Sequence, residues 1–492
     1  METKTKLFLY FIGAIVSLSS IFQMGYSNAY PNTSIDQFKA YLNHSYTHRG
    51  GGYMSENTYS WLWSAILNVW FIGFALGSFV AIPVTDSLGR KKGLLFGNAL
   101  TLISIAIMTI SIIFDVFELL IVGRLISAFA SGIAMCALIL FLQEISPNEI
   151  RGSMGFYAEL AFVVMNTVGA ILGMSMFLGN HLPMLVGFAV IPSVISIIAL
   201  IPLHETAKFL LIKHGNEGGA KESLQFYMNL NDEEVNDQLD AISDEAEESS
   251  GTIKTLLTTP HLRKGLLLGM FALQITCSIW PIIYYSTDFL RKANIDYDLA
   301  ESFSSGMLIV STVATVIGML VMERFSRRKL FIFVSIINIF ALILFVICSQ
   351  LQPRIDSIKY GCIVAIFIHG TSYSFATGPV AWFITSELVP ISYRALAQSI
   401  ALGVNQLTAL VLTFIVFPLY NIIDSWSLLI LYIIPGIFAL IYLWFNLPET
   451  KNRDIADVIE DIKNGKTSQP IKNKYEMAKI STNNTADGIS DN

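Results

Sequence analysis

Charged side chains are scarce in this sequence, since Lys, Arg, Asp and Glu together make up only 14% of its 492 residues. Soluble domains carry about a quarter of such residues, so this composition excludes a chain that is mostly surrounded by water. Cysteine is also rare, and the four cysteines all fall inside apolar stretches. This placement argues against a disulfide framework and favours packing residues.

The sequence also lacks the motifs of several functional classes. It contains no phosphate-binding loop, no ATPase motif and no grouping of catalytic residues. We therefore expect neither an enzyme nor a pump driven by nucleotide hydrolysis. Nothing in the sequence suggests a nucleic-acid partner, and we expect no cofactor and no bound metal.

Long apolar runs are what the sequence does have. Hydrophobic residues make up 53% of the chain, and a helix needs about 20 apolar residues to cross a bilayer core of about 30 Å. The runs predict an all-α membrane protein with about twelve transmembrane helices. They lie near residues 7–29, 60–84, 93–114, 119–142, 153–178, 183–203, 265–287, 303–322, 330–350, 360–386, 395–420 and 426–447.

The basic residues predict how the chain is oriented. Most Lys and Arg residues fall in loops on the same side as the N-terminus, as in the runs 90–92 and 327–329. Cytosolic loops of membrane proteins carry this excess, so both termini are expected in the cytosol, with the plasma membrane as the expected location. The sequons at Asn43 and Asn32 then lie on or near the outer side, and Asn43, farther from a span, is the stronger candidate for glycosylation.

The apolar runs form two groups of six. The expected organisation is an N-terminal bundle (1–203), a cytosolic helical linker (204–262), a C-terminal bundle (263–448) and a cytosolic tail (449–492), disordered after about residue 464. Short motifs recur in the same order in both halves: DSLGRKKG and ERFSRRKL, EISPNEIRG and ELVPISYRA, HETAKFL and PETKNR. This repetition indicates a duplicated unit and two pseudo-symmetric six-helix bundles around a central site.

Further short sequences carry a resemblance to a known family. They are FQMGY (22–26), Gly123–Arg124, YYST (284–287), GPVAWFITSEL (378–388) and PETK (448–451). On these motifs, about residues 10–455 resemble the sugar porter family of the major facilitator superfamily, and within it the animal facilitative glucose transporters. The resemblance implies the major facilitator fold and transport by alternating access.

The resemblance also implies a role for the charged motifs, as ion-pair clusters that hold the two halves together on the cytosolic side and release them when the carrier faces inward. Arg90 is expected to pair with Glu144, and Arg327 and Arg328 with Glu387. A simpler interpretation is that Arg90 and its basic neighbours only anchor their loop in the cytosol. The expected members are Asp86, Arg90, Glu144, Arg151 and the capping Glu205, and in the second half Glu323, Arg327, Arg328, Glu387, Arg394 and the capping Glu449.

Candidate substrate-binding residues lie near the bilayer centre. Gln274 and Asn405 are each about ten residues into a span, and uncharged polar side chains suit sugar hydroxyls. The resemblance implies that Tyr284 and Tyr285 form the extracellular gate and that Trp382 lies near the inner mouth. Packing or interhelical hydrogen bonding is the alternative role for each of them. The full candidate set is Gln23, Glu159, Gln274, Trp280, Tyr284, Tyr285, Trp382 and Asn405.

Several departures from the family weaken the case for glucose as the substrate. A lost hydrogen bond weakens binding by about 0.5–1.5 kcal/mol, and several losses together reduce affinity strongly. The departures are Ile275 and Trp280 for a glutamine and an asparagine, Ser311 for an asparagine, Ser374 for a glutamate, Thr377 for a proline and Gln406 for a tryptophan.

Glu159 is an acid within a span, where the family has a glutamine. Such acids are costly and usually functional. Glu159 is a candidate to bind a cationic or polyol substrate, or to carry a proton with His369 as a relay; alternatively it is a protonated hydrogen-bonding group. Ser27 argues against proton coupling, because proton-linked sugar porters carry an aspartate there.

The favoured function is a facilitative uniporter of a hexose or related polyol, with a small-molecule solute and the lipid bilayer as its partners. A second hypothesis is a carrier of a non-sugar organic solute, with proton coupling through Glu159. A third is a nutrient sensor that binds solute without moving it.

Overall fold

Helices make up the regular secondary structure of the described part of the chain, which has no strand. The computed structural model describes residues 3–48, 52, 54–147, 150–247, 252–322, 324–451, 453 and 455–465. Glu323 and the segment 466–492, on which the predicted disorder falls, lie outside the described residues.

Nine of the described helices or helix pairs are long and apolar enough to cross a membrane. Lipid offers no hydrogen-bond partners, so apolar segments satisfy their backbone groups internally by forming helices. In the first half these spans are α4 (Glu56–Leu88), α5 (Arg90–Ile113), α6 (Phe117–Glu144) and α8 with α9 (Leu182–Leu200). In the second half they are α14 with α15 (Pro260–Lys292), α16 (Tyr297–Met322), α17 (Arg327–Leu351), α20 (Ile391–Ile423) and α21 to α22 (Trp426–Asn446).

The three other predicted spans are bent, short or interrupted helices. The first span is split into α1 (Thr3–Ser20) and α2 (Phe22–Thr33), which meet at 47°. The fifth is the shorter α7 (Arg151–Leu172), and the tenth consists of α18 (Lys359–Ser372), a π-helical turn (Tyr373–Thr377) and α19 (Gly378–Glu387). Together these segments confirm the predicted all-α membrane fold.

Shorter helices occupy the connections. The linker contains α10 (Ala207–His214), α11 (Glu217–Met228), α12 (Asp232–Glu247) and α13 (Ile253–Thr258), and the tail contains α23 (Ile455–Asn464). Two of the described helices were not predicted: α23 in the tail, and α3 (Ile35–Thr47), which lies between the first and second spans. We call the end of the molecule with α3 the α3 end, and the end with the arginine-rich turns the basic end.

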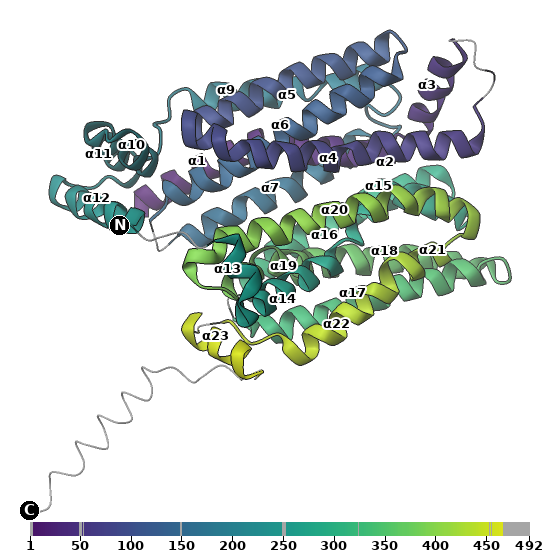
Figure 1. The fold of residues 1–492 in the computed structure, drawn as a ribbon. Coiled ribbons are helices and arrows are strands. Elements are labelled where there is room, and N and C mark those ends of the chain that lie inside the picture. Colours follow the sequence, from purple (N-terminus) through teal and green to yellow (C-terminus); the bar gives the residue numbers. More distant parts are fainter. Residues whose placement is uncertain are drawn as a thin grey trace, which may run out of the picture.

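The spans form two bundles that lie side by side, one purple to blue and the other green to yellow (Figure 1). Between them α4 packs on α20, α7 on α16, and α2 on α15. These contacts join span two to span eleven, span five to span eight, and span one to span seven. Spans one, two and five correspond to spans seven, eight and eleven in the other half, so a twofold exchange of the halves leaves this set of contacts unchanged. The pattern confirms the predicted pseudo-symmetry of the two bundles.

Glycines on the corresponding spans two and eight let helices approach closely in both bundles. Gly77 of α4 lies against the Phe129 backbone of α6, and Gly318 of α16 lies against the Phe375 backbone of the tenth span. At both positions a Cβ atom would overlap a carbonyl oxygen of the neighbouring helix. Small residues at helix interfaces allow this kind of packing in membranes.

We expect Gly77→Ala and Gly318→Ala each to lower the melting temperature of the purified protein, because overpacking costs about 1–3 kcal/mol. Gly403→Ala is the matched control, since a Cβ at this glycine in α20 meets no atom within 4 Å. Melting curves that do not separate the first two variants from the control would contradict this packing.

Candidate functional site

Hydrogen bonds between the bundles gather at the α3 end. The Tyr284 hydroxyl donates to Asn28 Oδ1 at 3.1 Å. Asn32 Nδ2 donates to Ser286 Oγ at 2.8 Å, and Asn32 Oδ1 accepts from the Thr287 backbone N–H at 3.1 Å. All five residues are buried. These bonds fasten α2 to α15 and close this end of the interface.

The second tyrosine of the pair also lies among the contacts that close the α3 end. Tyr285 is fully buried, its ring stacks on Phe417 at 4.7 Å, and its hydroxyl lies 3.5 Å from Asn68 Nδ2. The structure therefore places Tyr284 and Tyr285 at the seam between the bundles, where the resemblance implied a gate.

Three further cross-bundle contacts were not predicted from the sequence. The Tyr297 hydroxyl donates to the Thr33 carbonyl at 2.9 Å. Ser175 donates through Oγ to the buried Glu301 carboxylate at 2.5 Å. Nearer the middle, the Thr167 hydroxyl lies 2.8 Å from the hydroxyl of Thr312. These residues are polar positions within or beside spans, and only their partners in space reveal their role.

At the basic end, the ion pairs lie within one bundle. Arg90 binds Glu144 through Nε at 3.0 Å and through a terminal nitrogen at 2.9 Å, with both side chains largely buried. Asp86 is 4.0 Å from Arg90, which is a weak contact, and it binds Lys213 more closely, at 3.0 Å. Thr206 donates to the second Glu144 oxygen at 2.6 Å. The cluster joins α5, α6 and the start of α10, rather than the two halves.

The second cluster has the same plan with one difference. Arg327 pairs with Glu387. Arg328 was predicted to join this pair, but it does not. Its guanidinium points to the end of the last span and donates to the Trp444 carbonyl at 2.6 Å. Nε of Arg394 is buried without a partner in the described chain, as is Oε2 of Glu387. Glu323 and the side chain of Arg151 lie outside the described residues.

The two predicted capping glutamates occupy equivalent positions. Glu205 Oε1 accepts from the backbone N–H groups of Arg90 and Lys91, at 2.9 and 3.0 Å. Glu449 accepts from the N–H groups of Arg327 and Arg328, at 3.0 and 3.3 Å. A carboxylate at this position satisfies the free N–H groups of a helix and interacts favourably with its dipole. Each half therefore fastens its third or ninth span by the same device.

The turns before these helices differ between the halves. Gly89 has φ of 101°, in the region that favours glycine, and it begins α5. Its counterpart Ser326 has φ of −58°, and its hydroxyl oxygen accepts from the Lys329 backbone N–H at 3.4 Å. The second copy thus replaces a glycine turn with a side-chain cap.

In the middle of the molecule, the seventh span is broken between α14 and α15. The Cys277 N–H bonds to the Gln274 carbonyl rather than continuing the α-helical pattern to Leu273. Asn405 Nδ2 donates to the Leu273 carbonyl at 2.8 Å and contacts Cys277 Sγ at 3.2 Å. The Asn405 amide therefore stabilises the helix break. This is the interhelical hydrogen bonding that was the alternative to a substrate-binding role. The Gln274 side chain is partly exposed beside this break.

An aromatic cluster surrounds Trp280, which is 5% exposed. Its ring lies 5.3 Å from Trp70, 5.0 Å from Phe71 and 6.2 Å from Phe162, between ring centroids. Tyr284 adjoins the same cluster at 6.1 Å. The bulky indole, where the family has an asparagine, therefore places an apolar layer directly beneath the tyrosine pair.

Glu159 lies on the α7 face that looks toward this cluster. Glu159, Phe162 and Asn166 follow helical spacing, and Phe162 contacts Trp280 across the interface. The Glu159 side chain is partly exposed. It is close enough to Tyr373 for the two side chains to interact electrostatically. His369 is fully buried and its Nε2 pairs with Ser278 Oγ at 3.0 Å, so this contact does not connect it to Glu159.

Several buried polar atoms near the middle of the spans have no hydrogen-bond partner within the described chain. Buried polar groups are normally satisfied by protein, water or ligand, so unsatisfied ones on facing spans are candidate ligand contacts. Gln23 Nε2 donates to Ser127 Oγ at 3.3 Å, which leaves its carbonyl oxygen free. Among these unsatisfied atoms are Gln23 Oε1, Asn166 Oδ1 and Gln406 Oε1. Trp382 lies nearer the basic end, with its indole close to Tyr373. Asn166 was missed by sequence reasoning; its polarity within a span was the available signal.

The two sequons differ in accessibility. Asn32 is 2% exposed and belongs to the closure at the α3 end. Asn43 lies in α3 and is partly exposed, while Ser45 of its sequon is fully buried and bonded to the Asp115 carbonyl.

Three comparisons relate the chain to known proteins. A family model described as "Sugar (and other) transporter" matches residues 12–461. The chain is 27% identical over 464 residues to facilitated glucose transporter member 1 of solute carrier family 2 from Gallus gallus, covering 92% of this chain and 94% of that protein. It is 28% identical over 467 residues to member 3 from Mus musculus, covering 93% of each chain.

Among solved structures, the fold resembles the xylose transporter XylE from E. coli in an inward open conformation. The TM-score is 0.72 at 16% identity, with 92% of this chain and 99% of that chain covered. The nucleoside transporter NupG is similar with a TM-score of 0.54 at 14% identity, covering 89% of this chain and 98% of that chain. These likenesses confirm the predicted major facilitator fold.

We expect Asn405→Ala to lower the melting temperature of the ligand-free protein, because each lost hydrogen bond costs about 0.5–1.5 kcal/mol. Gln406→Ala, on the same helix, removes an amide oxygen that has no partner and should change the melting temperature less. Equal destabilisation by the two variants would contradict the assignment of Asn405 to the helix break.

Proposed function

Because the chain belongs to the family of sugar (and other) transporters, we propose that it is a facilitative uniporter of a hexose or related polyol that works by alternating access. The observation that carries this proposal is the asymmetry between its two ends. Cross-bundle hydrogen bonds from Asn28, Asn32 and Thr33 close the α3 end, whereas the ion pairs at the basic end each stay within one bundle.

The basic end is proposed to face the cytosol. Arg90, Lys91, Arg327 and Lys329 lie in the first turns of α5 and α17 at this end, and the cytosolic side of a membrane protein carries the excess of basic residues. Both chain termini then lie in the cytosol of a plasma-membrane protein, and the conformation is inward-facing. Glycosylation at Asn43 remains part of the proposal, with attachment before Ser45 is buried.

The substrate is proposed to be neutral and hydroxylated. The free amide oxygens of Gln23, Asn166 and Gln406 are uncharged acceptors, which suit hydroxyl groups. Glu159 adds a further acceptor at the partly exposed face of α7. Trp280 and its aromatic neighbours offer an apolar surface for the ring face of a sugar. Since Trp280 replaces a polar residue of the family, a polyol or hexose other than glucose fits this set better.

The clusters at the basic end are proposed to keep each bundle rigid while it rocks. Each of the pairs Arg90–Glu144 and Arg327–Glu387 lies within one bundle, so we propose that both pairs stay formed throughout the cycle. The expectation from the sequence was instead that they release when the carrier faces inward. The free Nε of Arg394 and Oε2 of Glu387 are the groups available to the opposite bundle when the basic end closes.

A second candidate function is proton-linked transport of a non-sugar organic solute. The observation that favours it is Glu159, an acid in the middle of a span whose side chain is partly exposed. Acids in such positions often serve as proton carriers. The two candidates predict different responses to a pH gradient.

Uptake of labelled hexoses, pentoses, polyols and organic cations into proteoliposomes tests the proposal. We expect saturable uptake of a hydroxylated solute that stops at equal inner and outer concentrations, with or without a pH gradient. Glu159→Gln should preserve the rate and its pH profile, because the amide keeps an acceptor and has the shape of the carboxyl group. Accumulation driven by the gradient and abolished in this variant would favour the second candidate.

Breaking the buried ion pair should destabilise the N-terminal bundle. We expect Arg90→Ala to cost about 3–5 kcal/mol, because it leaves the Glu144 carboxylate buried and unpaired, and Arg90→Met/Glu144→Met to recover most of this loss. Arg90→Lys separates the two interpretations of the basic run, since it keeps the anchoring charge but not the two-nitrogen contact. A melting temperature for Arg90→Lys equal to that of the parent would support a purely anchoring role.

A further inference from the structure

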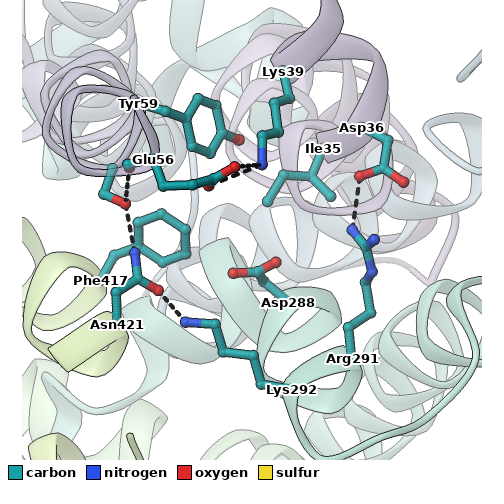
Figure 2. A pocket seen from close by; sticks show the side chains of 11 residues that line it. Ile35, Asp36, Lys39, Glu56, Tyr59, Asp288, Arg291, Lys292, Phe417 and Asn421 are labelled. Carbon is teal, nitrogen blue, oxygen red and sulfur yellow. Dashed lines mark hydrogen bonds and ion pairs between the residues drawn. The ribbon is translucent and has the colours of Figure 1, made fainter. Parts of the chain in front are cut away.

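A charged pocket lies between the two bundles at the α3 end, with a volume of about 320 Å³. Its walls come from α3 and α4 of one bundle and from α15 and α20 of the other (Figure 2). Six of its lining residues are charged, three of each sign: Asp36, Lys39, Glu56, Asp288, Arg291 and Lys292.

Two ion pairs line this pocket, but only one of them joins the bundles. Arg291 of α15 binds Asp36 of α3 at 2.7 Å, across the interface. Lys39 binds Glu56 at 2.8 Å, and both residues belong to the N-terminal bundle. Any motion that separates the bundles at this end must break the first pair and can leave the second intact.

Asp288 is the acid without a partner. Its carboxylate has no hydrogen bond or ion pair within the described chain, and Figure 2 shows it between the cationic side chains with no contact drawn to it. Lys292, one turn further along α15, bonds instead to Asn421 and lies over the Tyr420 ring at 4.9 Å. Asp288 is therefore unused in the closed arrangement.

The position of Asp288 on α15 gives it a second role. Asp288 and Arg291 are three residues apart, a spacing at which side chains on a helix reach each other. Both residues move with α15, so Asp288 stays within reach of Arg291 whatever the position of α3. Asp36 is within reach only while the α3 end is closed.

We propose that Arg291 exchanges carboxylate partners during transport, binding Asp36 when the α3 end is closed and Asp288 when it is open. Asp36 thus favours the closed end and Asp288 favours the open end. With both acids present, the arginine is paired in either state, and neither state is strongly preferred. This inference rests on the proposed alternating access, and it assigns Asp36, Asp288 and Arg291 as the residues that set the balance between the two states.

The test measures how often the α3 end opens. Ser64 of α4 is fully buried, and Asn68, one turn further along the helix, lies 3.5 Å from the hydroxyl of Tyr285 in the closed α3 end. Ser64→Cys is therefore a reporter that a membrane-impermeant maleimide reaches from the α3 side only when this end opens. The labelling rate is measured in proteoliposomes without added solute, and the rate of the protein without the reporter is subtracted to account for the four native cysteines.

In this reporter background, we expect Asp36→Asn to raise the labelling rate and Asp288→Asn to lower it. Exposed ion pairs contribute little, so each change should be about twofold to fivefold. Glu56→Gln is the matched control, because it makes the same chemical change in a pair within one bundle and should leave the rate within about twofold of the parent. A single symmetric peak in size-exclusion chromatography confirms that each variant is folded before its rate is compared.

The test depends on the two variants changing the labelling rate in opposite directions. If Asp288→Asn raises the labelling rate as Asp36→Asn does, or leaves it unchanged, the exchange of partners is refuted. Solute uptake by the same preparations is a separate readout: opposite shifts in labelling without uptake of any sugar would uphold the exchange while removing the proposed substrate class. Normal sugar uptake together with labelling shifts of the same sign would uphold the proposed substrate class and refute the exchange of partners.

Discussion

The structure depends on the fact that lipid offers no hydrogen-bond partner, so polar groups within the spans must be satisfied by other spans or by a solute. At the α3 end much of this requirement is met between the bundles, where Tyr284 donates to Asn28 and Asn32 bonds to Ser286 and to the Thr287 backbone. Near the middle it is not met, since Gln23 and Asn166 retain free carbonyl oxygens in the described chain. One constraint thus produces both a closed end and a polar middle that a hydroxylated solute can complete.

The duplicated unit explains how such a molecule moves. Glycines on the corresponding spans two and eight allow close packing in each bundle, and Glu205 and Glu449 cap equivalent helices. Arg90–Glu144 and Arg327–Glu387 hold the basic end of each bundle together internally. Since these strong contacts are internal, the contacts that change during a transport cycle are those between bundles, most of which are single hydrogen bonds or exposed ion pairs of modest energy.

Much of this arrangement could be predicted from the sequence, because its signals are local or repeated. Apolar length predicted the spans, and the family resemblance carried by the matched motifs implied the pairing of Arg90 with Glu144 and the caps at Glu205 and Glu449. Contacts that depend on how separate spans meet in space could not be predicted. Arg328 binds the Trp444 carbonyl because the last span ends beside it, which no motif records. Likewise, the pairing of Ser175 with Glu301 and the use of Asn32 as a closing residue rather than a sequon follow only from the approach of the bundles.

The most direct test of the rocking motion uses spin labels near the first residues of α5 and α17 and just beyond their last residues. One pair replaces the exposed Lys92 and Lys329 at the basic end, and the other replaces the exposed Phe114 and Ile355 at the α3 end. Pulsed electron paramagnetic resonance distances should show that one pair shortens whenever the other lengthens, as solute or lipid conditions shift the populations. Distances that lengthen together at both ends, or that stay fixed at one end while the other varies, would contradict two rigid bundles moving about a shared centre.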